Sequence, residues 1–85
     1  MNGTSRHVVR LFGSAREAAG AERVTLELGQ GATAADAVAA LGAAHPELGA
    51  LLPRSRVAVN LEYVDAGTRL APGDEIAILP PVGGG

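Results

Sequence analysis

Short stretches of alternating apolar residues near both ends of the chain predict β-strands. The first is residues 7–12, in which Val9 and Leu11 share one face and Phe12 lies on the other. Residues 23–28 alternate strictly and predict a second strand. Residues 57–61, 62–64 and 75–79 predict three more, with Ile76 and Ile78 turned inward.

Two helices are predicted between and after the first strands. Thr33 and Asp36 form a capping box in front of a helix over residues 34–44, which Pro46 ends. Leu41 is expected to be the deepest residue of its apolar stripe, which comprises Ala34, Ala37, Val38, Leu41 and Ala44. Ser14 and Glu17 fit a second capping box, which predicts a brief helix that ends at Gly20.

A short irregular apolar segment with Leu48, Leu51 and Leu52 follows the main helix and is expected to seal the edge of the core. The order of the predicted elements indicates an α+β domain in which a mixed sheet is covered by one main helix. The chain has 85 residues and no internal repeat or boundary, so we expect a single domain over residues 1–85, with a flexible start at 1–6.

The last ten residues, IAILPPVGGG, carry the strongest functional indication in the sequence. Pro80 and Pro81 cannot donate to a sheet, so they end the last strand and stiffen the exit of the chain. The three glycines after Val82 have no side chains, so this tail can enter a narrow channel with its carboxylate unhindered. We therefore expect residues 80–85 to form a flexible functional tail; a frayed end or an inert linker is the alternative.

Composition narrows the classes of function. Hydrophobic residues make up 47% of the chain, as in a folded domain, whereas aromatic residues make up 2% and the net charge is -2. Scattered arginines and few stacking platforms argue against nucleic acid and anionic membranes as partners. The sequence has no cysteine and no lysine, so it offers no thiol and no side-chain amine for covalent chemistry. No signal peptide or spanning segment is evident, so we expect a cytoplasmic protein.

The sequence resembles the ubiquitin-like β-grasp proteins that carry sulfur, in particular the small subunits of molybdopterin synthase. The resemblance spans nearly the whole chain and rests on residues 9–12, 15–17, 58–60, 70, 73–75, 80–82 and 84–85. Its most specific part is Gly-Asp-Glu, a short strand, and Pro-Pro-Val-x-Gly-Gly in register at the terminus. The sequence departs from the family's pattern at Gly83, where Thr or Ser is frequent, and at Ile78-Leu79, where aromatic residues are common.

This resemblance implies a chemical role for the carboxylate of Gly85. An E1-like activating enzyme would use ATP and Mg²⁺ to adenylate it, and sulfur would then replace the adenylate to give a thiocarboxylate. The tail, Pro80, Pro81, Val82, Gly83, Gly84 and Gly85, would enter the large catalytic subunit, where the sulfur passes to cyclic pyranopterin monophosphate. The chain itself would hold no cofactor or metal and would not be an enzyme on its own.

The resemblance also implies an apolar docking surface at Phe12, Tyr63 and Leu79, although single exposed apolar residues are common. Several polar residues are expected to have structural roles instead of catalytic or binding roles. They are His7, His45, the solvated Arg16, and the turn residues Asp74 and Glu75. Two alternatives stay open. In the first, the chain is a ubiquitin-like modifier that is joined to other proteins. In the second, it is a sulfur carrier for another acceptor, such as the thiazole of thiamine.

Overall fold

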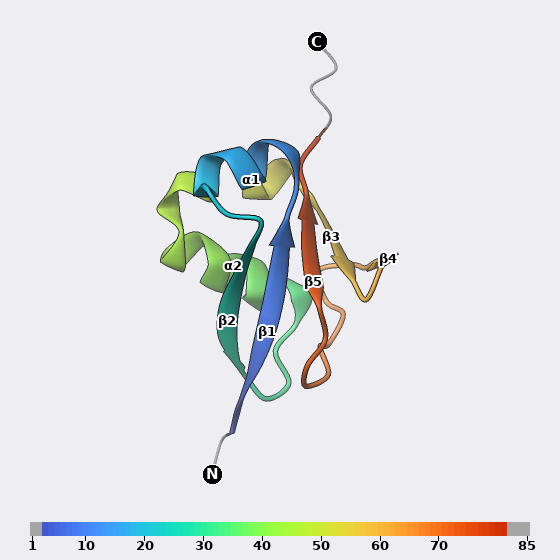
Figure 1. Cartoon of the computed structure of the whole chain (residues 1–85). Helices are drawn as coiled ribbons and strands as arrows, with labels where there is room; N and C mark the ends of the chain where they lie inside the picture. The colour runs from blue at the N-terminus through green and yellow to red at the C-terminus, as the bar shows by residue number, and fades with distance from the viewer. Residues whose placement is uncertain (1–2, 82–85) are drawn as a thin grey trace.

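The computed structural model describes residues 3–81, which form one mixed five-stranded sheet with helices packed on it (Figure 1). The strands are ordered β2-β1-β5-β3-β4 across the sheet. In chain order the elements are β1 (Thr4–Leu11), α1 (Gly13–Ala19), β2 (Arg23–Gly29), α2 (Ala34–Ala44), the 3₁₀ turns η1 (Pro46–Leu48) and η2 (Leu52–Arg54), β3 (Arg56–Val59), β4 (Glu62–Tyr63) and β5 (Ile76–Leu79).

The first and last strands lie side by side in the middle of the sheet. β1 pairs antiparallel with β2 on one side and parallel with β5 on the other, in the register Val9 to Ile76 and Leu11 to Ile78. β5 pairs antiparallel with β3 on its other edge. Because β1 and β5 run in parallel, both end at the same end of the molecule, where α1 also lies (Figure 1).

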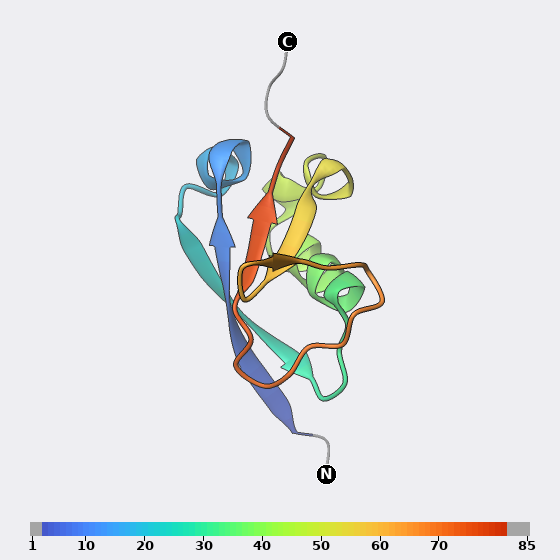
Figure 2. The ribbon, with the colours of Figure 1, turned by 90° about the vertical axis from the view of Figure 1, so that its right-hand side faces the viewer.

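Helix α2 covers one face of the sheet and leaves the opposite face open (Figure 2). The core between them contains Leu41, Ile76 and Ile78, each 1% exposed, as the alternation and helical spacing predict. The predicted α+β β-grasp fold with one main helix is therefore confirmed. The prediction for Ala44 is wrong, because this last residue of α2 is exposed and the fully buried Leu48 of η1 closes that end of the core instead.

The two predicted capping boxes have different outcomes. At α2, Thr33 Oγ1 accepts from the Asp36 amide at 3.2 Å and Asp36 Oδ2 accepts from the Thr33 amide at 2.9 Å, so that box is confirmed. At α1, the prediction of Ser14 as the cap is wrong. Gly13, with a φ of 52°, turns the chain out of β1 at once, so the helix begins at Gly13 behind Phe12 and Ser14 lies inside it.

Strand β1 begins earlier than the alternation of residues 7–12 predicts. Residues 4–6 pair with β2, so the predicted flexible start is wrong for them. His7 shares the inward face of Val9 and is only 3% exposed. Its Nδ1 donates to the backbone oxygen of Asp74 at 2.8 Å, since a carbonyl oxygen can only accept. His7 therefore ties β1 to the turn that leads into β5, which is a structural role.

The third strand ends at Val59, two residues before its predicted end. Asn60 and Leu61 have φ values of 50° and 72° and form the turn between β3 and β4. Positive φ at both central residues is the hallmark of a two-residue hairpin loop, so these residues cannot continue the strand.

Within residues 3–81, neither α-helix has the length and apolarity needed to cross a membrane.

Candidate functional site

The root of the predicted tail leaves from the centre of the sheet. β5 ends at Leu79, and neither Pro80 nor Pro81 belongs to a strand. Pro80 is half-buried whereas Pro81 is exposed, so the chain moves out of the domain within two residues. Val82, Gly83, Gly84 and Gly85 lie outside the described residues, so their predicted roles stay predictions.

The three residues predicted to dock a partner come together on the open face of the sheet. Phe12, Tyr63 and Leu79 line one hollow of about 210 Å³, although they come from the end of β1, from β4 and from β5. Phe12 is 40% exposed, Tyr63 is 57% exposed and Leu79 is half-buried. We call this surface the docking hollow; it comprises Phe12, Ala58, Leu61, Tyr63, Ala77 and Leu79.

Strand register explains why this hollow forms. Ile78 faces the core, so its neighbour Leu79 points to the open face. Ala58 is paired with Ala77 on β5 and with Tyr63 on β4, so two of the smallest side chains lie between larger ones. Ala58 and Ala77 leave a space, and the rings of Phe12 and Tyr63 border it. The result is an apolar recess directly beside the root of the tail.

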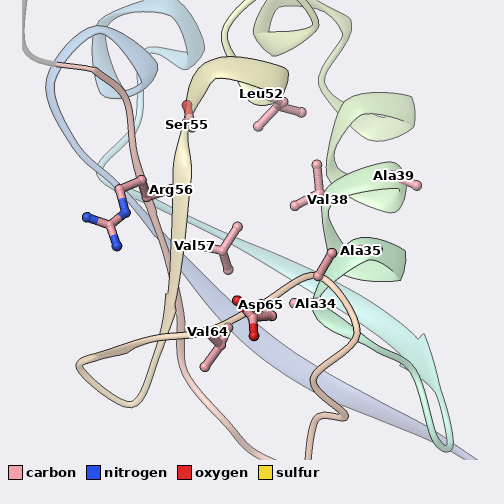
Figure 3. Close-up of a pocket in the computed structure, with 11 residues that line it drawn as sticks. Ala34, Ala35, Val38, Ala39, Leu52, Ser55, Arg56, Val57, Val64 and Asp65 are labelled. Carbon is pink, nitrogen blue, oxygen red and sulfur yellow. The ribbon is translucent and has the colours of Figure 1, made fainter.

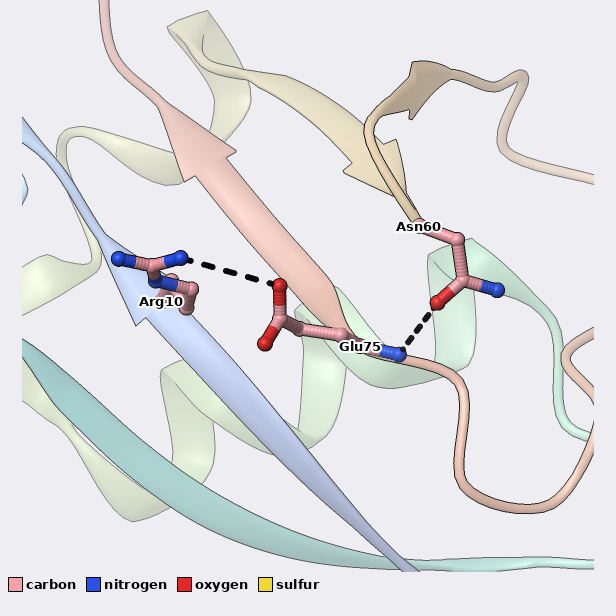
Figure 4. Close-up of polar contacts among 3 residues, drawn as sticks. All are labelled: Arg10, Asn60 and Glu75. Atoms are coloured by element: carbon pink, nitrogen blue, oxygen red, sulfur yellow. Dashed lines mark hydrogen bonds and ion pairs between the residues drawn. The ribbon is translucent and has the colours of Figure 1, made fainter.

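Arginines border the docking hollow. The guanidinium carbon of Arg10 is 5.7 Å from the centre of the Phe12 ring, and its Nη1 is 4.0 Å from Glu75 Oε1 (Figure 4). The guanidinium carbon of Arg56 is 3.7 Å from the centre of the Tyr63 ring. No ion pair within residues 3–81 involves Arg56. Glu75 therefore offsets the charge of Arg10, whereas the charge of Arg56 is available to meet a carboxylate of a partner.

A network of hydrogen bonds fixes the turn ahead of β5. The Asp74 carboxylate accepts from the Ala71 amide at 2.7 Å and from Asn60 Nδ2 at 2.8 Å. These two bonds, first that from Ala71 and then that from Asn60, lower the pKa of Asp74. Asn60 Oδ1 in turn accepts from the Glu75 amide at 3.0 Å (Figure 4). As predicted, Asp74 is a turn residue, and its negative charge stabilises this turn.

Arg16 and His45 lie in surroundings that fit the structural interpretations. Arg16 is exposed on α1, where its Nη2 is 3.8 Å from Glu22 Oε1. His45 caps the C-terminal end of α2 and its Nδ1 is 3.4 Å from Glu47 Oε2. Across the described ranges, no cluster of three or more His, Asp or Glu side chains is placed to hold a metal ion.

A larger groove of about 520 Å³ runs between α2 and β3 (Figure 3). Val38 on α2 points toward Val57 on β3 across it, and Leu52, Val64 and Arg56 also belong to its lining. The Ser55 hydroxyl donates to the Leu51 backbone oxygen at 2.8 Å, so this hydroxyl is already engaged. Most of the lining is apolar, although Arg56 and Asp65 also belong to it, and the groove shares no lining residue with the docking hollow.

Sequence reasoning missed two parts of this surface. Leu61 was predicted to lie in a strand, yet it occupies a turn and is 88% exposed at the edge of the docking hollow. Nothing in the sequence distinguishes Arg56 from the other scattered arginines. An Asn at position 60 was the available signal for the turn, because Asn adopts positive φ more readily than most residues.

The fold and the hollow beside the tail define a ubiquitin-like β-grasp protein that presents its C-terminal segment next to an apolar surface. The model of the ThiS family matches residues 9–85, which is nearly the whole chain. The chain therefore belongs to the ThiS family.

Named relatives agree with this assignment. The molybdopterin synthase sulfur carrier subunit of Chlamydomonas reinhardtii is 43% identical over 79 residues, which cover 91% of this chain and 95% of the relative. The crystal structure of small archaeal modifier protein 1 from Haloferax volcanii has a TM-score of 0.84 at 34% identity, covering 92% of this chain and 99% of that one. The comparisons confirm the predicted resemblance to molybdopterin synthase sulfur carriers.

One solved relative is part of an assembly. The complex of subunits 1 and 2 of the molybdopterin-converting factor from Helicobacter pylori contains a chain that matches with a TM-score of 0.68 at 28% identity. The match covers 94% of this chain and 99% of that one.

Proposed function

We propose that this chain is the sulfur-carrying small subunit of molybdopterin synthase and that the carboxylate of Gly85 carries the sulfur. The observation that carries the proposal is the position of the docking hollow, which contains Leu79, the last strand residue before the tail. A partner seated on this hollow receives the tail at the same time. The family match through residue 85 and the named relatives support the assignment.

The tail needs activation because a carboxylate is a poor electrophile. In the proposed cycle an E1-like enzyme uses ATP and Mg²⁺ to form an acyl adenylate at Gly85 with release of pyrophosphate. A sulfur nucleophile then displaces AMP and leaves the thiocarboxylate. The sequence contains no cysteine, so a carried sulfur has no thiol to occupy and the backbone terminus is the remaining position.

The larger subunit supplies the catalysis in this proposal. It binds the docking hollow through Phe12, Tyr63 and Leu79, takes up residues 80–85, and holds cyclic pyranopterin monophosphate where the thiocarboxylate can attack it. Hydrolysis then returns Gly85 to the plain carboxylate. The small chain contributes sulfur and a docking surface, holds no cofactor of its own, and acts in the cytoplasm.

Intact-mass measurement tests the sulfur-carrying role. The full chain is incubated with its activating enzyme, ATP, Mg²⁺ and sulfide, and we expect its mass to rise by the difference between sulfur and oxygen. A variant with one alanine added after Gly85 and a variant without Gly85 are the matched controls, and neither should gain sulfur. Sulfur gained by the extended variant would contradict the proposal.

A role as a protein modifier is the second candidate, because a relative with a TM-score of 0.84 is named a modifier protein. The two functions differ in the acceptor that the activated tail meets. Thiocarboxylated chain mixed with the large subunit and pterin precursor should yield dithiolene product and free chain. Covalent adducts with protein lysines in the producing cells would instead support modification, and sulfur transfer only with a thiazole synthase would indicate the thiamine route.

A further inference from the structure

The turn between β3 and β4 carries a residue that its backbone disfavours. Val59 and Glu62 pair across the turn, and the two residues between them have φ values of 50° for Asn60 and 72° for Leu61. Such a loop favours Asn followed by Gly, since glycine alone adopts positive φ without steric cost. Asn60 fits the first position, but Leu61 occupies the place that glycine prefers.

The leucine gains little within the domain in return. Its side chain is 88% exposed, so it contributes almost nothing to the hydrophobic core. It nevertheless lies at the border of the docking hollow, in the same recess as Tyr63 and Leu79. An exposed leucine in a disfavoured conformation thus extends the apolar surface beside the root of the tail.

The turn that presents Leu61 is held in place. Asn60 donates through its backbone amide to the Glu75 oxygen at 2.9 Å, and its side chain bonds to the Asp74 carboxylate and the Glu75 amide. Figure 4 shows Asn60 reaching across to Glu75 beside the start of β5. Because three hydrogen bonds fix its neighbour, Leu61 projects from a preorganised turn and loses little backbone freedom on contact with a partner.

We infer that the contact with the large subunit of molybdopterin synthase extends across the docking hollow to Leu61 at its edge, and that this subunit holds an apolar recess for the Leu61 side chain. The inference rests on the proposed function. The large subunit is the occupant because the surface around Leu61 is continuous with the hollow that the tail leaves from. The guanidinium of Arg56 stacks on Tyr63 of the same hollow, so a carboxylate on the partner beside that recess would complement its charge.

Replacing Leu61 by glycine separates folding from binding. The Leu61→Gly variant of the full chain should unfold in urea at a midpoint no lower than that of wild type, because glycine adopts the positive φ freely. Its affinity for the purified large subunit, measured by calorimetry, should fall at least about tenfold. If Leu61 only stabilised the turn, the urea midpoint of the Leu61→Gly variant would instead be lower than that of wild type.

Two further variants identify the cause of the loss. Leu61→Asn tolerates positive φ and keeps a side chain, so it should also lose affinity if the apolar contact matters. Leu61→Met keeps an apolar side chain and should retain most of the affinity. Unchanged binding by Leu61→Gly, or a loss seen only with the activating enzyme, would overturn the inference. Failure of the wild-type chain to bind the large subunit would overturn the proposed function as well.

Discussion

The guanidinium group of Arg56 lies over the ring of Tyr63, with its central carbon 3.7 Å from the ring centre. Arg56 is paired with Leu79 across β3 and β5, and Tyr63 is paired with Ala58 across β3 and β4. The stacked pair therefore joins the outer edge of the sheet to the root of the tail. A cation–π contact at an exposed site contributes about 0.5–1 kcal/mol, so it orders the rim more than it stabilises the fold.

The first prediction concerns the charge of Arg56. Arg56→Gln should weaken binding to the large subunit and reduce the salt dependence of that binding, because a charge at the rim of an interface attracts an opposite charge on the partner. The affinity is measured by calorimetry at low and high salt. Arg54→Gln removes the same charge from η2, outside the docking hollow, and is the matched control. Equal losses in both variants would show that only net charge matters.

The second prediction separates docking from folding at the hollow itself. Phe12→Glu and Leu79→Glu each place a charge on an apolar contact surface, so each should reduce affinity for the large subunit by more than about tenfold. Both variants should stay folded, because neither side chain lies among the buried residues of the core. Melting temperature and calorimetric affinity are the two measurements.

The control for these variants is Thr25→Glu, which adds the same charge at an exposed position of β2 outside the hollow. It should bind normally. A Phe12→Glu or Leu79→Glu chain that unfolds would show that these side chains support the core. A folded variant that binds and donates sulfur like wild type would remove the hollow from the docking model.

The third prediction tests the core under α2. Leu41 is 1% exposed, so Leu41→Ala should lower the free energy of unfolding by about 2–5 kcal/mol through lost burial and a cavity. The same substitution at the exposed Leu61 removes as many atoms but leaves no cavity and should change stability little. Urea unfolding of both variants gives the comparison, and similar midpoints would mean that α2 does not pack as described.

The fourth prediction is a pH dependence at Asp74. Its pKa is lowered in the folded state, so its contribution to stability is complete above the ordinary carboxyl pKa of about 4 and is lost as the pH falls through the lower folded value. Asp74→Asn replaces an oxygen that accepts from the Ala71 amide and should destabilise the chain at neutral pH. The gap in urea midpoint between wild type and variant should narrow as the solution is acidified below about pH 4. A constant gap would show that the charge of Asp74 contributes nothing.

Periodicity predicted the parts of the fold that depend on burial. The inward positions of Ile76 and Ile78, the anchor Leu41 and the Thr33 cap all follow from spacing alone, because alternate strand residues and one helix stripe must meet the core. His7 follows the same alternation although its side chain is polar. It lies two residues before Val9 on the same face, so alternation already placed it inside the domain.

Backbone conformation is what the sequence conveyed poorly. Ser14 and Glu17 have the spacing of a capping box, but the left-handed Gly13 starts α1 two residues earlier and leaves Phe12 as the cap. The Asn60–Leu61 turn was hidden because leucine has high hydrophobicity and no turn preference. The docking hollow depends on the pairing of Ala58 with Ala77, and this contact between distant segments follows from strand register alone.

The parallel pairing of β1 with β5 also determines how the domain bears mechanical load. If a partner drew the tail into a channel, a pull along the axis of β5 would act through Pro80 and Pro81. That strand lies between β1 and β3, so the pull shears the hydrogen bonds on both of its edges together instead of opening them one after another. The central strand thus anchors the tail, and traction on the last residues should leave the docking face intact.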